Sequence, residues 1–266
     1  MTYSLLTLEI DPRGVAHVML NRPEVHNAFN EALIGELTQV FHALDADKAV
    51  RLAVLAGNGK SFCSGGDLNW MKAMKNFTAE ENITDSQHLA RMFSTIHDFS
   101  KPLIGVVHGY AFGGGSGLAS VCDYVVAAES ATFGFTETRL GLIPATIAPF
   151  VMEKIGVSAA LAHFISGGTF SAQTAKDIGL IHKIVPEAEL KSTADAIVTE
   201  FLKAGPVASR KAKALVREVQ RLSKHDSKQD MTGYTANAIA QIRVSSEAQE
   251  GMSALLEKRK PLWGMP

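Results

Sequence analysis

Of the 266 residues only two are cysteine, the positive and negative charges nearly cancel, and no uninterrupted apolar run reaches membrane-spanning length. Cys63 and Cys122 are too few for a disulfide scaffold and fit a reducing compartment. The formal net charge of −1 gives no basic excess, so neither nucleic acid nor a membrane surface is expected as a partner. The N-terminus has no basic, apolar leader. Together these absences predict a cytoplasmic protein.

The nine histidines do not occur in a metal-ligand spacing such as HExxH, so we expect no metal site. His108, just before a glycine turn, is expected to have a structural role. Apolar residues make up 46% of the chain, which is ordinary for a folded globular protein of this length.

Short apolar segments alternate with turns and helical patterns in the first two thirds of the chain. Residues 3–10 and 15–20 predict a hairpin, and residues 51–56, 103–107 and 124–128 predict short buried strands. Asn30 is a candidate cap for a helix with an apolar face formed by Leu33, Ile34, Leu37, Val40, Phe41 and Leu44. Polar helical sequence covers residues 68–99, with an expected break near 77–78.

This alternation predicts a mixed α/β core built from repeated ββα-like turns. From about residue 188 to 257 helical periodicity dominates, with interruptions expected at 205–206 and near Gly233. The transition lies between residues 186 and 205. We therefore divide the chain into a core of residues 1–195 and a helical part of residues 196–266.

Two glycine-rich turns each follow an apolar segment and precede a helix start. One lies in GYAFGGGSGLASVCD (109–123) and the other in SGG (64–66). Because glycine lacks a Cβ, such turns bring main-chain N–H groups close to a ligand, and a helix N-terminus adds partial positive charge. The arrangement suits negative charge on an oxygen. One such turn is usually only structural; two could supply converging donors.

Glu137 stands among apolar residues between two glycines, without a lysine four residues on. A carboxyl group in such a setting would have a raised pKa and could exchange protons near neutrality. The alternative is a structural pairing of Glu137 with Arg139 or another residue. Asp67, directly after Gly66, is expected to cap a helix rather than act as a second acid.

These segments together resemble the crotonase superfamily, the enoyl-CoA hydratase/isomerase family. The resemblance covers nearly the whole chain, in the family's order, through LNRPEVHNAFN (20–30), SFCSGGDL (61–68), VHGYAFGGGSGLASVCDYVVAA (107–128), FGFTETRLGLIP (133–144) and EGMSALLEKRKPLW (250–263). It implies an α/β fold, a spiral of ββα turns with a helical C-terminal part, assembled as homotrimers or dimers of trimers. Residues 196–266 would serve trimerisation and complete the CoA site. The implied substrate is an acyl-CoA thioester, and no separate cofactor is implied.

The resemblance also assigns roles to single residues. The amides of Gly66 and Gly114 would hold the thioester oxygen, and Glu137 would be the acid–base. Residues implied to bind substrate are Val25, Ala28, Ser64, Asp67, Leu68, Gly117 and Pro144. Side chains that could also contribute, to the CoA phosphates or the acyl pocket, are Arg22, Lys258, Arg259, Lys260, Trp70, Met71 and Met74. Each of these has a structural alternative as a helix end or a packing face.

Family hydratases usually pair two glutamates, and the partner of Glu137 falls on Gly117 here. A single carboxylate could hydrate an enoyl thioester, with Ser116, backbone groups or the substrate orienting the water. It could instead move a proton as a Δ3,Δ2-enoyl-CoA isomerase does. DLNWMKAM (67–74) and ETRLGLIPATIAPFV (137–151) resemble the branch acting on methylglutaconyl-CoA and carboxygeranoyl-CoA, in leucine and acyclic-terpene breakdown. We therefore predict an enoyl-CoA hydratase, with the isomerase or an inactive acyl-CoA-binding scaffold as alternatives.

Overall fold

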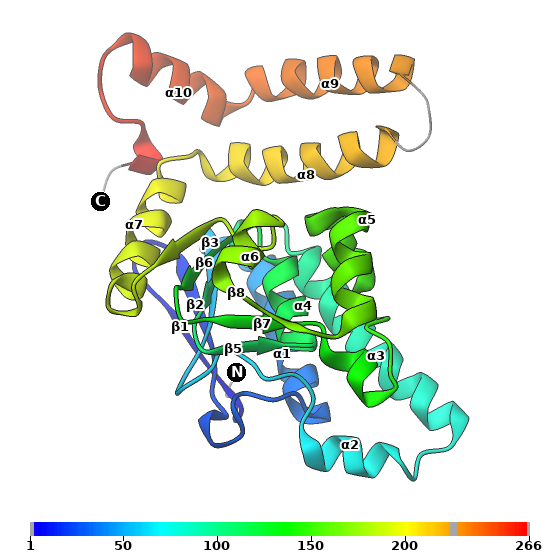
Figure 1. Ribbon diagram of the computed structural model, residues 1–266. Helices are drawn as coiled ribbons and strands as arrows, with labels where there is room; N and C mark the ends of the chain where they lie inside the picture. The colour runs from blue at the N-terminus through cyan, green and yellow to red at the C-terminus, as the bar shows by residue number, and fades with distance from the viewer. Residues whose placement is uncertain (1–2, 224–227, 265–266) are drawn as a thin grey trace. The chain divides into compact units, whose positions relative to one another are not determined.

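The computed structural model describes residues 3–223 and 228–264 of the chain (Figure 1). It divides into two compact units, Met1–Phe99 with Leu103–Asp195, and Ser100–Pro102 with Ala196–Pro266. The predicted division between residues 195 and 196 did not include the short segment Ser100–Pro102 in the second unit.

Strands and helices alternate along the first unit (Figure 1). Its strands are β1 (Leu6–Ile10), β2 (Val15–Leu20), β3 (Leu52–Gly57), β4 (Leu103–Val107), β5 (Tyr110–Phe112), β6 (Tyr124–Ala128), β7 (Thr132–Gly134), β8 (Thr169–Ser171) and β9 (Lys183–Val185). Its α-helices are α1 (Glu31–Ala46), α2 (Leu68–Met74), α3 (Ala79–His97), α4 (Gly114–Val121), α5 (Ala148–Ser166) and α6 (Ala172–Asp177). Three 3-10 turns, η1 (Pro23–Val25), η2 (Thr136–Leu140) and η3 (Glu187–Glu189), complete it.

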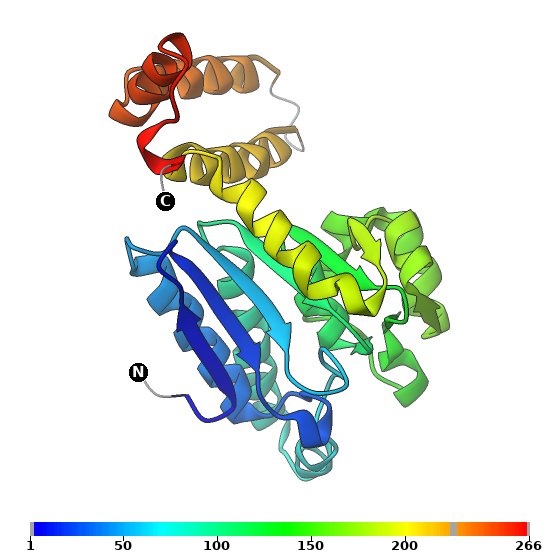
Figure 2. The ribbon, with the colours of Figure 1, turned by 90° about the vertical axis from the view of Figure 1, so that its left-hand side faces the viewer.

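The strands form two sheets, and the chain moves from one to the other in successive turns. The larger sheet has the order β1-β2-β3-β4-β6-β9, and the smaller has the order β5-β7-β8. Figure 2 shows β1, β2 and β3 side by side; β1 is antiparallel to β2, and the pairs from β2 to β9 are parallel. Strand β4 is followed by β5 in the other sheet and then by α4, and β6 is likewise followed by β7. This is the predicted spiral of ββα turns.

Local sequence accounts for the first elements. The hairpin β1–β2 is confirmed, although β1 begins at Leu6. Asn30 caps α1 by accepting the amide of Leu33, and all six predicted apolar residues of this helix are buried. Thr78 caps α3 in a reciprocal pair with Glu81, which places the break between α2 and α3 where it was expected.

Helix α5 is the one helix of the described chain that is long and apolar enough to cross a membrane by length and composition alone. At Gly156 its backbone leaves the helical conformation, with φ 72° and ψ 168°. Such an interruption would leave main-chain groups without partners in lipid. Residues Val151, Ile155 and Ala160 are buried in the fold, and we interpret α5 as a packing helix of the first unit.

The second unit is helical, with α7 (Leu190–Leu202) entering it from the first unit. It contains α8 (Pro206–Ser223), α9 (Lys228–Arg243), α10 (Ser246–Leu256) and the short turn η4 (Leu262–Gly264). Figure 1 shows α8 and α9 side by side. The interruption at Gly205–Pro206 is confirmed. The interruption expected near Gly233 is wrong, because Gly233 lies inside α9 with no positive φ, and no atom lies within 4 Å of a Cβ built on it.

Candidate functional site

The two glycine turns lie against each other through main-chain contacts. The amide of Cys63 donates to the carbonyl of Tyr110 at 3.0 Å, and the amide of Phe112 donates to the carbonyl of Cys63 at 3.0 Å. A Cβ on Gly115 would lie 2.1 Å from that Cys63 carbonyl oxygen. Only glycine fits at residue 115 while the turns are this close.

The amide of Gly66 points out of the turn that carries it. Gly66 forms a parallel bridge with Phe29. In this bridge Phe29 donates to the carbonyl of Gly65 at 2.7 Å, and Asp67 donates to the carbonyl of Phe29 at 2.8 Å. These bonds use the groups on either side of Gly66, so its own N–H points away from Phe29. Among the described residues, no turn, loop or cap carbonyl accepts it.

Gly114 is the first residue of α4, so its amide is one of those that a helix leaves without an internal partner. The preceding amide, that of Gly113, donates to the carbonyl of Gly134 at 2.8 Å. The amide of Gly117 donates to the carbonyl of Gly113 at 3.0 Å, as a normal helical hydrogen bond. No turn, loop or cap carbonyl in the described ranges accepts the Gly114 amide. A Cβ on Gly114 would lie 2.7 Å from the ring of Phe29. The two candidate donors therefore share Phe29 as a neighbour.

Pairing of the two strands β5 and β7 brings Glu137 to the start of α4. Phe112 pairs with Gly134, and η2 begins two residues after that strand. A Cβ on Gly113 would lie 3.0 Å from Oε1 of Glu137. The carboxyl group thus lies against the residue directly before the Gly114 donor.

The Glu137 side chain is half-buried. Its Oε2 atom is buried and has no hydrogen-bond partner among the described residues. Burial raises the pKa of Glu137, and the residue's own main-chain amide only partly opposes this rise. The alternative pairing with Arg139 is wrong for the described chain, in which Arg139 is exposed and makes no ion pair with Glu137. Its side chain instead extends past Gly167 and Gly168.

Two expectations about α4 need correction. The hydroxyl of Ser116 is fully buried; it donates to the carbonyl of Ala111 at 2.6 Å and accepts the amide of Gly134 at 3.3 Å. It is therefore not available to orient water. Gly117 is buried beneath other side chains, because a Cβ there would lie 2.4 Å from Cγ2 of Ile147 and 3.0 Å from Phe93. A substrate contact at Gly117 has no room in this arrangement.

Asp67 and Arg22 fasten the segment before α2. Asp67 caps α2 by accepting the amides of Asn69 and Trp70, as predicted, and it forms a 2.9 Å ion pair with Arg22. Burial opposes ionisation of Asp67, but these amides and the guanidinium outweigh it and hold its pKa below the usual value. Arg22 also donates to the carbonyl of Ala28 at 2.6 Å. With these partners Arg22 has a structural role.

The loop after β2 depends on Asn27, which sequence reasoning missed. Asn27 is completely buried and has a positive φ of 56°. Its side chain donates to the carbonyls of Asn58 and Ser61 and accepts the amide of Arg22. This network fixes the backbone of the predicted substrate-binding residues Val25 and Ala28. Ser64 joins the same loop by donating its amide to His26 at 3.0 Å.

Helix α2 places two large side chains beside Gly66. A Cβ on Gly66 would lie 3.6 Å from Cγ of Met71 and 3.8 Å from Cε3 of Trp70, which are ordinary contact distances. Leu68 is 79% exposed, and its atoms are not the nearest to that Cβ. Trp70 and Met71 are thus neighbours of a candidate donor.

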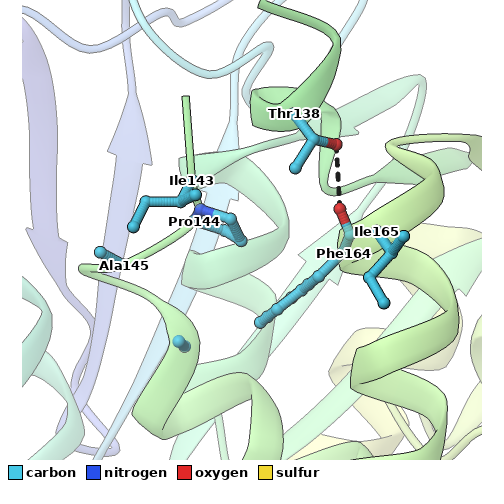
Figure 3. A pocket seen from close by; sticks show the side chains of 7 residues that line it. Thr138, Ile143, Pro144, Ala145, Phe164 and Ile165 are labelled. Carbon is cyan, nitrogen blue, oxygen red and sulfur yellow. Dashed lines mark hydrogen bonds between the residues drawn. The ribbon is translucent and has the colours of Figure 1, made fainter. Parts of the chain in front are cut away.

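A separate apolar hollow of about 300 Å³ follows Glu137 along the chain (Figure 3). It is lined by Thr138, Ile143, Pro144, Ala145, Ala148, Phe164 and Ile165. The Thr138 hydroxyl donates to the carbonyl of Phe164 at 2.9 Å and joins η2 to the end of α5 (Figure 3). Of the predicted site residues only Pro144 lines this hollow.

Other predicted residues have structural roles. His108 contacts the carbonyl of Gly59 at 2.9 Å. Cys63 and Cys122 are buried, and burial raises the pKa of Cys63 to about 12. Arg259 forms ion pairs with Glu250 and Glu257. No cluster of metal-ligating side chains occurs in residues 3–223 and 228–264.

Comparison with known proteins shows the family of the chain. Residues 11–266 match the family model described as enoyl-CoA hydratase/isomerase. The 2,3-dehydroadipyl-CoA hydratase of Escherichia coli is 35% identical over 243 residues, which are 91% of this chain and 92% of that protein.

Solved structures agree as well. An enoyl-CoA hydratase from Shewanella pealeana superposes with a TM-score of 0.92 and 36% identity, covering 98% of this chain and 96% of that one. An enoyl-CoA hydratase from Mycobacterium smegmatis gives a TM-score of 0.91 and 31% identity, covering 98% of this chain and all of the other. The chain therefore belongs to the enoyl-CoA hydratase/isomerase family, the crotonase superfamily, and is an enzyme of the enoyl-CoA hydratase kind.

Proposed function

We propose that this enzyme adds water across the 2,3 double bond of an enoyl-CoA thioester. In this proposal the amides of Gly66 and Gly114 hold the thioester oxygen, and Glu137 is the only carboxylate acid–base. The observation that carries it is the position of Glu137. Its carboxyl group contacts Gly113, beside the open Gly114 amide, and has one buried oxygen without a partner.

The two amides would act on the charge that develops during the reaction. Attack at C3 shifts electrons toward the thioester oxygen, which becomes an enolate oxygen. Fixed N–H donors and the N-terminus of α4 stabilise that charge without reorganising. Removal of one such donor typically lowers kcat by about 10²–10³-fold.

Glu137 would move the proton. In its ionised form it takes a proton from water while the water oxygen bonds to C3, and it then returns a proton to C2 of the enolate. The product gains one water, and the carboxylate is regenerated. Burial raises the pKa of Glu137 toward neutral pH. A general base is most effective when its pKa lies near the pH at which the enzyme works.

One observation favours a second candidate, the Δ3,Δ2-enoyl-CoA isomerase. Ile147 and Phe93 cover Gly117, so this side of α4 offers no second carboxylate. Proton transfer between C4 and C2 needs only one carboxylate and no water. The isomerase would therefore use the same Glu137 and the same two amides.

The finer substrate proposal is a branched enoyl-CoA that carries a carboxylate, such as methylglutaconyl-CoA. The Escherichia coli relative is named for the CoA thioester of an unsaturated dicarboxylic acid, which supports a substrate of this class. Arg139 is exposed close to Glu137 in sequence and makes no ion pair with it in the described chain. It is a candidate partner for the substrate carboxylate.

We also propose that the enzyme needs no cofactor, functions in the cytoplasm, and forms a homotrimer or a dimer of trimers. The small number of cysteines, both of them buried, supports a reducing compartment. Exposed apolar side chains of the second unit, including Val216, Leu255 and Leu256, support self-association. Light scattering after size-exclusion chromatography measures the assembly.

A matched pair of variants at residue 114 tests the role of the amide. Gly114→Pro removes the N–H at a helix position that tolerates proline, whereas Gly114→Ala keeps it. Both place a Cβ against Phe29. We expect the proline variant to have kcat at least tenfold below that of the alanine variant at similar thermal stability. Equal rates would contradict the role of Gly114.

Product mass distinguishes the candidate reactions. The enzyme is incubated in heavy water with methylglutaconyl-CoA, with crotonyl-CoA and with a 3-enoyl-CoA. Hydration adds the mass of water, whereas isomerisation changes the mass only by deuterium exchange. Failure to turn over any of the three, with CoA binding retained, would favour the inactive scaffold.

A further inference from the structure

Trp70 links Gly66 to a residue on the next helix. A Cβ built on Gly66 would lie 3.8 Å from the ring carbon Cε3 of Trp70 and 3.6 Å from Cγ of Met71. At the other edge of the ring, Nε1–H donates to Oδ1 of Asp85 on α3 at 3.2 Å. The indole thus spans the distance between a candidate oxyanion donor and a carboxylate of α3.

Helix α2 has few other anchors. None of its residues is fully buried, and the buried residues of α3, Met92, Phe93 and Ile96, all lie in its C-terminal half. At its N-terminus α2 is held by the Asp67 cap and its ion pair with Arg22. The bond between Trp70 and Asp85 ties the first turn of α2 to the second turn of α3.

Asp85 occupies a setting unusual for an exposed helix. Its side chain is half-buried although Glu81, Thr84 and Ser86 around it are exposed. Burial raises its pKa; the bond from Trp70 and the charge of His88 oppose the rise, and the charge of Glu31 adds to it. A carboxylate kept in this position is better explained by a specific partner than by solvation of the helix surface.

We propose that Asp85 is a positioning residue that acts through Trp70 to fix the wall of the acyl site beside the Gly66 amide. Trp70 and Met71 would contact the acyl carbons nearest the thioester, and Asp85 would set how closely they approach. The inference rests on the proposed function in that Gly66 holds the thioester oxygen.

Substitutions at the two ends of the bond separate the hydrogen bond from charge and from ring packing. Asp85→Leu removes the acceptor, Asp85→Asn keeps an acceptor oxygen without the charge, and Trp70→Phe keeps a ring without the N–H. Gln87→Ala, at an exposed position of the same helix, is the control. Calorimetry measures dissociation constants of CoA and of butyryl-CoA, a ligand that cannot be hydrated.

For Asp85→Leu and Trp70→Phe we expect butyryl-CoA to bind roughly three- to tenfold more weakly, with CoA binding unchanged. The double variant should resemble either single one, because both remove the same bond. Asp85→Asn and Gln87→Ala should stay within about twofold of the parent protein. A loss equal for CoA and butyryl-CoA, or no loss at all, would overturn the proposal.

Fluorescence gives a readout that a purely structural role would not change. The chain has two tryptophans, so in a Trp263→Phe background Trp70 is the sole emitter. Butyryl-CoA should change the intensity or wavelength of its emission, and CoA alone should not. An identical response to both ligands would show that Trp70 does not contact the acyl group, against the proposal.

These binding measurements do not depend on turnover. If the enzyme hydrates no enoyl-CoA but Trp70 senses the acyl group and Asp85→Leu weakens its binding, the proposed reaction fails while the positioning role stands. If hydration occurs and both readouts are silent, the positioning role fails alone.

Discussion

The carboxyl group of Glu137 occupies the space in which Gly113 would carry a side chain. A Cβ on Gly113 would lie 3.0 Å from Oε1 and 3.5 Å from Cδ of Glu137, and the backbone at Gly113 has a φ of 51°. The glycine that precedes α4 therefore has two functions. It allows the left-handed turn that starts the helix, and it lets the acid approach the candidate donor at Gly114.

Gly113→Ala should disturb both functions. We expect kcat to fall roughly ten- to a hundredfold, because a displacement of the catalytic group by about 1 Å can cost that much. Gly156→Ala is the matched control, since Gly156 has a φ of 72° but no atom within 4 Å of its added Cβ. It should lose stability by about 1–2 kcal/mol without loss of kcat. Equal kcat in the two variants would contradict the contact with Glu137.

Glu137→Gln should change how stability depends on pH. The folded-state pKa of Glu137 is raised above its ordinary value of 4.5. Between 4.5 and the raised pKa the folded protein binds more protons than the unfolded chain, so the free energy of unfolding falls as pH rises through that window. Glutamine removes this term. Urea unfolding should therefore show the variant gaining stability relative to the parent as pH rises, and a constant difference would contradict the raised pKa.

The pH dependence of the hydration rate should show the ionisation of Glu137. If ionised Glu137 takes the proton from water, kcat/KM for hydration falls as pH drops through the raised pKa, and the midpoint lies above 4.5. Glu137→Gln should lower kcat by roughly 10²–10⁴-fold and remove this limb from the residual activity. A midpoint at or below 4.5 would argue against a buried carboxyl base.

Gly117 and Ile147 should be coupled in stability. Gly117→Ala places a Cβ 2.4 Å from Cγ2 of Ile147 and should cost about 1–3 kcal/mol of unfolding free energy. Ile147→Ala empties the same space and should cost about 2–5 kcal/mol. In the double variant the new methyl partly fills the cavity, so the total loss should be at least about 1 kcal/mol below the sum. Additive losses in urea unfolding would contradict this packing.

Asn27 should be essential for the loop after β2. Asn27→Ala leaves the carbonyls of Asn58 and Ser61 without their donor, and each buried unsatisfied group costs roughly 1–3 kcal/mol. Glu24→Ala, at an exposed position of the same loop, should change stability by less than about 0.5 kcal/mol. Thermal unfolding of the two variants makes the comparison, and similar midpoints would count against the network.

Elements with a clear local signal could be predicted from the sequence. The period of α1, the turn between β1 and β2, and the Thr78 cap all follow from residues close to one another in the chain. Strands β5, β7 and β8 have only three residues each, too few to show a period, and their existence depends on pairing between distant segments. Helix α5 has few buried residues for its length, so its apolar positions give no clear face.

The candidate site shows the same limit. Glycine turns and an acid in an apolar loop are visible in the sequence, and the structure brings Glu137 to Gly113 through the pairing of β5 with β7. Ile147 packs over Gly117 although the two residues are thirty positions apart in the chain, so no local sequence pattern predicts this contact. The same holds for Lys154, whose buried amine donates to the Cys122 carbonyl at the end of α4. Long-range packing decided these features.

Both candidate oxygen-binding groups belong to the peptide backbone. A random exchange of one side chain for another leaves a peptide N–H in place, except where proline enters. Evolution of a chain with this architecture can therefore alter the residues at positions such as Trp70 and Arg139, and so explore new acyl groups, while its capacity to stabilise an enolate is inherited almost unchanged.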